Sequence, residues 1–244
     1  MNNNPVVISG AGLWTPANKI SNEELVDTYN RYAKKYNLEY AHSIATGKKT
    51  AKLLSSAAFI AKASGIKSRF VYRHEGILAV DRMRPKFATR PIDSLSHQAE
   101  MALNAAKIAL VEANKSAADI DAVIVSCAYT QRSYPAIAIE VQNQLGIKGF
   151  GFDMLVACSA ATFALQRAYE MVSASTARAV LVINPELTSP QINYCDRDSH
   201  FIFGDAATAT IVERGESANS EHVYEIISTR AVTSYSNNIR SDFS

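Results

Sequence analysis

The chain has 244 residues, of which 48% are hydrophobic and 20% charged, as in an ordinary globular protein with one large domain or two small ones. Its formal net charge of +2 gives no argument for a nucleic-acid or membrane partner. No apolar stretch approaches the roughly 20 residues of a membrane helix. Met1–Pro5 lack the charged and apolar regions of a signal peptide. We therefore expect a cytoplasmic protein without nucleic-acid or membrane partners.

The first half of the chain predicts a short strand followed by several helices. Val6–Gly10 is an apolar strand, and Asn22–Tyr36 has the composition of a helix. Residues 37–64 contain few helix breakers, so a mostly helical excursion is expected there. Charged residues and two prolines make Ile77–Pro91 an exposed loop or insertion. Ser94–Asn114 places its alanines and leucines on one broad face, which predicts an amphipathic helix.

The second half alternates regularly between apolar strands and helices. This pattern predicts an α/β layer with a largely buried sheet, closed by strands that resemble hairpin partners. The expected helices are Ala136–Leu145, which stops at Gly146, and Ser159–Ser173. The expected strands are Ala122–Ser126, Phe150–Val156, Ala179–Ile183, Ala207–Val212 and Val223–Thr229.

Cys158 lies where a predicted buried strand ends and a predicted helix begins. The free N–H groups and the positive dipole of a helix N-terminus favour a thiolate and can stabilise an oxyanion. Small neighbours, Ala157 and Ala160–Ala161, would let a substrate approach the backbone, but they are equally typical of tight helix–sheet packing. Position alone therefore leaves a catalytic and a structural role about equally favoured.

The other titratable residues give no second strong site. Cys127 ends a strand and is expected to be a packed core residue, whereas Cys195 lies in a polar loop. The odd set of three cysteines lacks metal spacing and favours a reducing compartment. His97, at a helix start, is expected to be exposed, and His200 to be a packed strand residue.

Two further patterns are weak signals of phosphate binding. The basic segment Arg82–Arg90 could attract phosphate groups, but a solvated loop is the more common role of such a segment. Gly10–Gly12 is too short for a nucleotide-binding fingerprint and precedes no helix start. No histidine or cysteine pair supports a metal site.

Five segments together resemble one family, the β-ketoacyl-acyl carrier protein synthases III. They match its opening strand, its T-G-I-x-x-R segment, its active-site loop with the following helix, its nucleophile motif and its D-R-x-x-x-x-I-F-G-D-G-A block. In this chain they are Val6–Pro16, Ser64–Arg69, Ser133–Gly146, Asp153–Ala161 and Asp196–Ala207. Their order and spacing agree over nearly the whole chain.

The resemblance implies a thiolase-like layered α/β fold. Two similar βαβ-rich halves of one chain pack as layered sheets and helices, and the whole protein is usually a homodimer. Residues 1–244 would then be the N-terminal thiolase-like domain, with insertions near 35–58 and 74–92, and the C-terminal half would be missing. The implied reaction is a Claisen condensation in two steps. Acyl-coenzyme A loads Cys158, and malonyl-acyl carrier protein then loses carbon dioxide and attacks the thioester. Coenzyme A would be a substrate, with no permanently bound cofactor.

The resemblance also assigns four substrate-binding positions. Phe59 falls where the family has an aromatic residue that stacks on the adenine of coenzyme A, and Tyr134 where an aromatic crosses the dimer to shape the acyl pocket. Lys67 replaces a cofactor-binding arginine, and Arg197 matches the other such arginine. Phe59 offers a smaller surface than the family's tryptophan, and Lys67 lacks the planar fork of arginine. Ala206 replaces the second glycine of the G-D-G block.

The family's catalytic histidine and asparagine motifs are not found in these 244 residues, and Asn237–Asn238 is no match in context. We therefore expect this piece alone to be unable to condense. Alternatives remain a hydroxymethylglutaryl-coenzyme A synthase-like enzyme, a secondary-metabolite ketosynthase, and a non-catalytic truncated partner of a full-length synthase. A relative that joins two long acyl chains head to head carries glutamate where Tyr134 stands, which argues against that reaction.

Overall fold

The computed structural model describes residues 4–236 of the chain. Residues 1–3 and 237–244, including Asn237–Asn238, lie outside the described residues. The helices are α1 Asn22–Glu39, α2 Ala41–Ala45, α3 Ala57–Ser64, α4 His97–Glu112, α5 Ile137–Leu145 and α6 Ala160–Ser173. The strands are β1 Val6–Trp14, β2 Lys19–Ser21, β3 Ser68–Phe70, β4 Ala122–Cys127, β5 Phe150–Leu155, β6 Ala179–Glu186, β7 Ala206–Arg214 and β8 Tyr224–Glu225.

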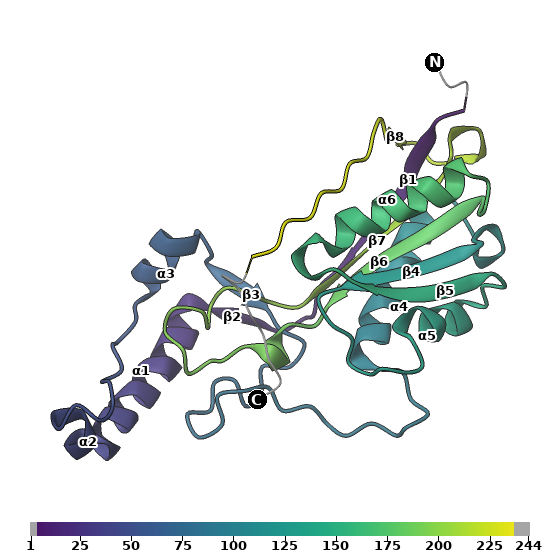
Figure 1. Ribbon diagram of the computed structural model, residues 1–244. Helices are drawn as coiled ribbons and strands as arrows, with labels where there is room; N and C mark the ends of the chain where they lie inside the picture. The colour runs from purple at the N-terminus through teal and green to yellow at the C-terminus, as the bar shows by residue number, and fades with distance from the viewer. Residues whose placement is uncertain (1–3, 237–244) are drawn as a thin grey trace.

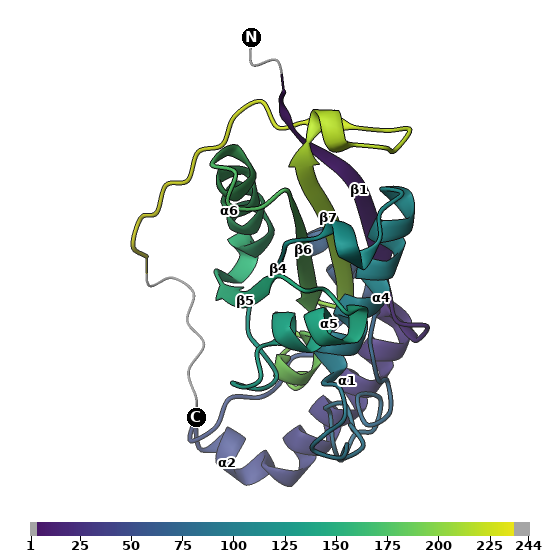
Figure 2. The same ribbon diagram turned by 90° about the vertical axis from the view of Figure 1, so that its right-hand side faces the viewer.

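A six-stranded mixed sheet forms the centre of the molecule, in the order β5-β4-β6-β7-β1-β8. β4 pairs in parallel with β5 and β6, whereas the pairs β6–β7, β7–β1 and β1–β8 are antiparallel. Helix α6 covers one face of the sheet, and α4 and α5 cover the other (Figure 2). Successive residues of Ala122–Val125 in β4 and Ala179–Ile183 in β6 alternate between these two cores, so both stretches are apolar. The predicted α/β class is confirmed.

Helix α4 packs unusually close to β1, because small residues line the contact. A Cβ added at Gly12 would lie 2.1 Å from the carbonyl oxygen of Ala105, and one added at Gly10 would lie 2.5 Å from that of Ala109. These approaches leave no room for a side chain on the strand. The two glycines that resemble part of a nucleotide fingerprint therefore serve helix–sheet packing.

A smaller lobe extends from the sheet (Figure 1). It contains α1, α2, α3 and the two-stranded sheet β2–β3 around a third apolar cluster, whose largest fully buried members are Tyr29 and Tyr194. Ser21 caps α1 through a reciprocal capping box with Glu24, and Gly65 in the left-handed conformation ends α3. The lobe joins the main sheet through Asp205, whose amide donates to the Phe70 carbonyl oxygen at 2.8 Å.

Several sequence expectations are corrected by the structure. Residues 46–56 are not helical, so only part of the 37–64 excursion has that form. The predicted strand Val223–Thr229 shrinks to Tyr224–Glu225, and this short strand pairs with β1 and not with β7. The segment Ile77–Pro91 is irregular as expected, but Ile77 is fully buried in the lobe's core.

The strand before Cys158 is not buried. β5 has only one neighbour in the sheet, and its end residues Phe150 and Leu155 are 44% and 57% exposed. Its apolar run resembles that of a central strand, but the run says nothing about how many strands flank it. The described residues place β5 at a sheet edge.

Candidate active site

Cys158 is the residue around which the candidate site is built. It lies in a single 3₁₀ turn, Ala157–Ser159, between β5 and α6, and its side chain is exposed. The predicted strand–turn–helix junction is confirmed. Ala157 adopts a positive φ of 45°, and the Ser159 side chain does not cap α6. The amides of Ser159 and Ala160 donate to the carbonyl oxygens of Val156 and Ala157, whereas the Ser159 side chain accepts no hydrogen bond from the amides that follow in α6.

Two hydrogen-bonded ties hold this junction in place. The Asp153 carboxylate accepts from the amides of Ile137 and Ala138 at 2.8 Å each, which joins β5 to the start of α5. Burial raises the pKa of Asp153, and the two amide donors oppose that rise. On the other side, the Ser126 hydroxyl donates to the Ala160 carbonyl oxygen at 3.0 Å. The start of α6 is thus fixed to the end of β4.

The other two cysteines differ from Cys158 in their surroundings. Cys127 is fully buried at the end of β4, where burial raises the pKa of its thiol to about 12. The predicted packed role of Cys127 is confirmed, because its thiol stays protonated and inaccessible. Cys195 is half-buried on a turn of the lobe. Cys158 is the exposed thiol of the three.

Phe59 and Arg197 come together in the lobe. The Arg197 guanidinium carbon lies 3.9 Å from the centroid of the Phe59 ring. Its Nε donates to the Leu54 carbonyl oxygen at 2.9 Å, and an outer nitrogen pairs with Asp198 at 2.9 Å. The Ser56 hydroxyl caps α3 by accepting from the Phe59 amide at 3.0 Å. Two residues from distant parts of the chain therefore form one flat aromatic–guanidinium stack.

Lys67 and Tyr134 are both on the surface. Lys67 has an exposed side chain, and its carbonyl oxygen accepts from the Asn22 amide at 3.1 Å. Tyr134 is 85% exposed, immediately before the residues that lead into α5. In the described part of the chain, neither side chain contacts the Phe59–Arg197 stack or Cys158. The structure therefore joins two of the five predicted site residues and leaves three apart.

Asp205 is a structural centre that the sequence did not single out. It is 1% exposed, and its carboxylate accepts from the Tyr72 amide at 2.7 Å and from the Ser189 amide at 2.8 Å. The Ser189 hydroxyl donates to it at 2.6 Å. Burial raises the pKa of Asp205, against these donors. A Cβ on the preceding Gly204 would lie 2.7 Å from the Phe70 carbonyl oxygen, which gives the quoted I-F-G-D segment a packing reason.

The histidines lie apart from Cys158 in the described part of the chain. His97 is 5% exposed, contrary to expectation, because Tyr72 and Phe87 pack edge-on against its ring. His200 is packed as expected, stacked on Tyr29 at 5.0 Å, although it lies in a turn and not in a strand. Among the contacts of the described residues, none joins a histidine to Cys158.

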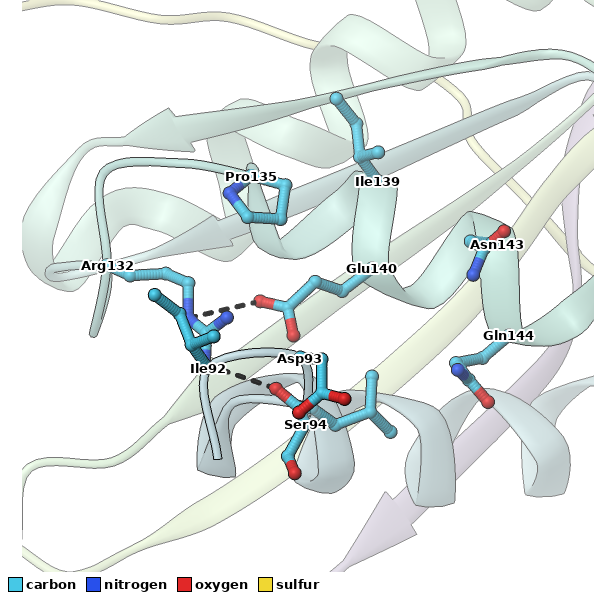
Figure 3. Close-up of a pocket in the computed structure, with 10 residues that line it drawn as sticks. Ile92, Asp93, Ser94, Arg132, Pro135, Ile139, Glu140, Asn143 and Gln144 are labelled. Carbon is cyan, nitrogen blue, oxygen red and sulfur yellow. Dashed lines mark hydrogen bonds and ion pairs between the residues drawn. The ribbon is translucent and has the colours of Figure 1, made fainter. Parts of the chain in front are cut away.

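A cavity of about 280 Å³ opens between α5 and the segment before α4 (Figure 3). The Glu140 carboxylate accepts from the Ser96 amide at 2.8 Å and lies 3.7 Å from Arg132. The lining residues are Ile92, Asp93, Ser94, Leu95, Arg132, Pro135, Ile139, Glu140, Asn143 and Gln144. None of the five predicted site residues lines it, so it is a separate surface feature.

Arg82 and Arg90 are committed to contacts within the protein. Arg82 donates from Nε to the Arg84 carbonyl oxygen at 3.2 Å, and Arg90 pairs with Glu100 at 2.5 Å. Within residues 4–236, no group of three or more histidine, cysteine, aspartate or glutamate side chains could hold a metal ion. No helix in that range is long and apolar enough to cross a bilayer.

Comparison with known proteins points to one family. The family model for 3-oxoacyl-[acyl-carrier-protein] synthase III matches residues 152–231, which include Cys158 and Arg197. A beta-ketodecanoyl-[acyl-carrier-protein] synthase from Pseudomonas aeruginosa is 53% identical over 218 residues, 89% of this chain and 62% of the relative. A beta-ketoacyl-[acyl-carrier-protein] synthase III from Granulibacter bethesdensis is 29% identical over 224 residues, 91% of this chain and 56% of that protein.

Solved structures give the same answer. The crystal structure of 3-oxoacyl-[acyl-carrier-protein] synthase III from Aquifex aeolicus superposes with a TM-score of 0.63 at 27% identity, covering 89% of this chain and 55% of that one. The enzyme from Pseudomonas aeruginosa superposes with a TM-score of 0.62 at 21% identity, which shows the fold. The chain thus spans a little more than half the length of its relatives, and it belongs to the β-ketoacyl-acyl carrier protein synthase III family.

Proposed function

We propose that this chain carries the acyl-accepting part of a β-ketoacyl-acyl carrier protein synthase III, with Cys158 as the nucleophile. The observation that carries the proposal is the exposed thiol in a fixed turn at the start of α6. The family model spans that turn. A nucleophile needs access and a rigid mount, which the junction offers, and we assign the role of oxyanion donor to the amides of α6 that follow Ala160.

The first step is transthioesterification. The Cys158 thiolate attacks the carbonyl carbon of acyl-coenzyme A, and the electron pair of the carbonyl moves to its oxygen. The amides at the start of α6 stabilise this oxyanion. When the tetrahedral intermediate collapses, the bond to the coenzyme A sulfur breaks. The acyl group remains on Cys158, and coenzyme A leaves as a thiolate that takes up a proton.

The Phe59–Arg197 stack is the proposed site for the adenine end of coenzyme A. A purine in contact with both groups needs about 7 Å between them, because each stacking contact takes about 3.5 Å. Their separation here is 3.9 Å, so Arg197 must move outward before adenine can enter. Lys67, exposed next to α3, would then meet a phosphate of the cofactor.

We further propose an eight-carbon primer. The relative at 53% identity is described as making a β-ketodecanoyl product, which has ten carbons. Malonyl-acyl carrier protein contributes two carbons after it loses carbon dioxide, so the remaining eight come from the primer. Octanoyl-coenzyme A is therefore the first substrate to test for this chain.

The second step is decarboxylative condensation with malonyl-acyl carrier protein. Loss of carbon dioxide leaves a carbanion equivalent, which attacks the acyl carbonyl carbon bound to Cys158. The carbon–sulfur bond of that thioester then breaks, and the Cys158 sulfur leaves as a thiolate. The family's histidine and asparagine motifs for this step are not in the 244 residues, so we expect this chain to be loaded but not to condense. A homodimer in the cytoplasm is proposed for the working enzyme. The unpaired edge of β5 supports pairing with a second copy.

Intact mass spectrometry tests the proposal directly. The chain is incubated with acetyl-, octanoyl-, palmitoyl- and acetoacetyl-coenzyme A, and a Cys158→Ala variant is treated in parallel. We expect an added octanoyl mass that is absent in the variant. Loading by acetoacetyl-coenzyme A in preference to octanoyl-coenzyme A would favour the hydroxymethylglutaryl-coenzyme A synthase alternative. No adduct with any thioester would overturn the proposed function and favour a non-catalytic partner.

A further inference from the structure

Residues 40–74 carry positive charge without a compensating acid. They hold seven of the chain's 25 lysine and arginine residues and none of its 23 aspartate and glutamate residues. The rest of the chain is consequently net negative. The cations of the segment are Lys48, Lys49, Lys52, Lys62, Lys67, Arg69 and Arg73. All except the buried Arg69 and the half-buried Lys52 are exposed, so the segment produces a local positive field at the surface.

Residues 46–56, which we call the strap, are fixed along α1 although they form no helix or strand. The side-chain NH₂ of Asn37 donates to the Lys52 carbonyl oxygen at 2.9 Å. The side-chain oxygen of Asn37 accepts from the backbone N–H of Lys52 at 2.8 Å. Asn30 makes the same pair of bonds to Ser55, at 3.0 and 2.8 Å. The two asparagines lie about two turns apart on α1, so they hold the strap alongside the helix at two points.

Two lysines of the strap lie over tyrosine rings of α1 and of its C-terminal cap, Tyr40. Lys49 Nζ is 3.2 Å from the centroid of Tyr40, and Lys52 Nζ is 5.1 Å from that of Tyr36 and 5.4 Å from that of Tyr32. The rings cover about 12 Å of the helix at 1.5 Å per residue. These cation–π contacts keep the two charges in a row instead of leaving them on free side chains.

The strap reaches the proposed coenzyme A site. Lys52 Nζ donates to the Cys195 carbonyl oxygen at 3.1 Å, and the Leu54 carbonyl oxygen accepts from Arg197. Lys62 lies one turn along α3 from Phe59. Leu53 and Leu54 are 69% and 49% exposed in the middle of these cations. A basic rim with an apolar centre therefore borders the Phe59–Arg197 stack.

The acids nearest this rim already have partners. Asp198 pairs with Arg197 at 2.9 Å, and Asp196 accepts from the Asp198 amide at 3.2 Å and from the Ser199 hydroxyl. Glu39 is hydrogen-bonded to Tyr40. Lys48, Lys49 and Lys62 form no ion pair within residues 4–236, so their charges are available to a partner.

We propose that the strap and α3 form the surface on which an acidic carrier protein docks, an inference that rests on the proposed function. Coenzyme A and a carrier protein present the same phosphopantetheine arm. They differ in the group joined to the end opposite the thiol, which is the adenine nucleotide in coenzyme A and the protein in the carrier. The surface beside the proposed adenine site therefore faces the body of the carrier protein when its arm is inserted. One phosphate would meet a single lysine, whereas a row of cations around exposed leucines fits an acidic amphipathic helix.

The test compares carrier-protein binding with acyl loading. Lys48 and Lys62 are exposed, and their side chains make no hydrogen bond, ion pair or ring contact within the described residues, so the double variant Lys48→Glu/Lys62→Glu should keep the fold. Its control is Lys107→Glu/Lys148→Glu, which reverses two exposed lysines outside the segment. The probe is the acyl carrier protein from the organism that makes this chain, in its apo form. The apo form lacks the phosphopantetheine arm. Its Kd is measured by calorimetry at about 50 mM and about 500 mM salt.

We expect the strap variant to weaken carrier binding about tenfold at low salt and to reduce the salt dependence, while the control stays near the wild-type value. Loading of Cys158 by octanoyl-coenzyme A should be unchanged in both variants. Equal carrier binding in all three proteins, or no measurable binding to wild type at low salt, would overturn the docking surface. Loss of loading with unchanged carrier binding would also overturn it, in favour of a contact to coenzyme A. The acyl adduct reports on the proposed function and the carrier Kd on the docking surface, so either can fail while the other stands.

Discussion

His97 should make the stability of the fold depend on pH below neutrality. Its ring is 5% exposed, and burial together with the nearby charge of Arg90 lowers its pKa from 6.5 to about 4. A hydrogen bond from Gln131 and the charge of Glu100 act in the opposite direction, and Arg73 adds to the lowering. The neutral imidazole is therefore the form that the folded protein holds at pH 5.

The sign follows from the protons bound by each state. Between pH 6.5 and 4 the unfolded chain protonates at His97 while the folded chain does not, so the free energy of unfolding falls as the pH falls. At about 1.4 kcal/mol per pKa unit, the full shift is worth about 3 kcal/mol, of which about 2.5 kcal/mol is lost by pH 4.5. Above about pH 7.5, where neither state binds the proton, the contribution is constant.

Urea unfolding followed by circular dichroism measures this loss in the wild type and in a His97→Gln variant between pH 7.5 and 4.5. Glutamine does not titrate, so the difference between the two curves should shrink by about 2.5 kcal/mol as the pH falls. Subtraction cancels the carboxyl groups that titrate in the same range. His42→Gln, at an exposed position, is the matched control. Parallel curves for wild type and His97→Gln would refute the reasoning.

Three further changes test the packing and the surface. Gly12→Ala should destabilise the fold by about 1–3 kcal/mol, because its Cβ would lie 2.1 Å from the Ala105 carbonyl oxygen. Urea unfolding measures this, with Ala11→Ser at an exposed position as the control, and an unchanged unfolding midpoint would contradict the close packing. Lys115→Met should cost about 3–5 kcal/mol in the same assay, since it takes the ammonium at 2.8 Å away from the 1% exposed Glu213 and leaves that carboxylate the Ser9 hydroxyl as a neutral donor. A loss below about 1 kcal/mol would argue against a buried ion pair. Asn37→Ala should release the strap and speed tryptic cleavage at Lys48, Lys49 and Lys52. The control Asn143→Ala, at an exposed position, should not change the cleavage rate, and equal rates in wild type and Asn37→Ala would show that Asn37 does not hold the strap.

Local patterns in the sequence were sufficient for most helices and central strands. The alanine-rich face of α4, the glycine that stops α5 and the strand–turn–helix junction at Cys158 all follow from residues within a few positions of one another. Periodicity and capping are properties of short segments, so they can be predicted without knowing the rest of the fold.

The tertiary structure alone decided which of these segments meet. The sequence could not place β5 at the sheet edge or bury His97, because each outcome depends on neighbours far along the chain. Arg197 reaches Leu54 across 143 residues, and the resemblance named Phe59 and Arg197 without bringing them together. The strap shows the same limit: Asn30 and Asn37 have helical spacing in α1, but that spacing does not tell which segment they bind. Burial and contact are set by the assembled chain, whereas a sequence records only what each segment prefers by itself.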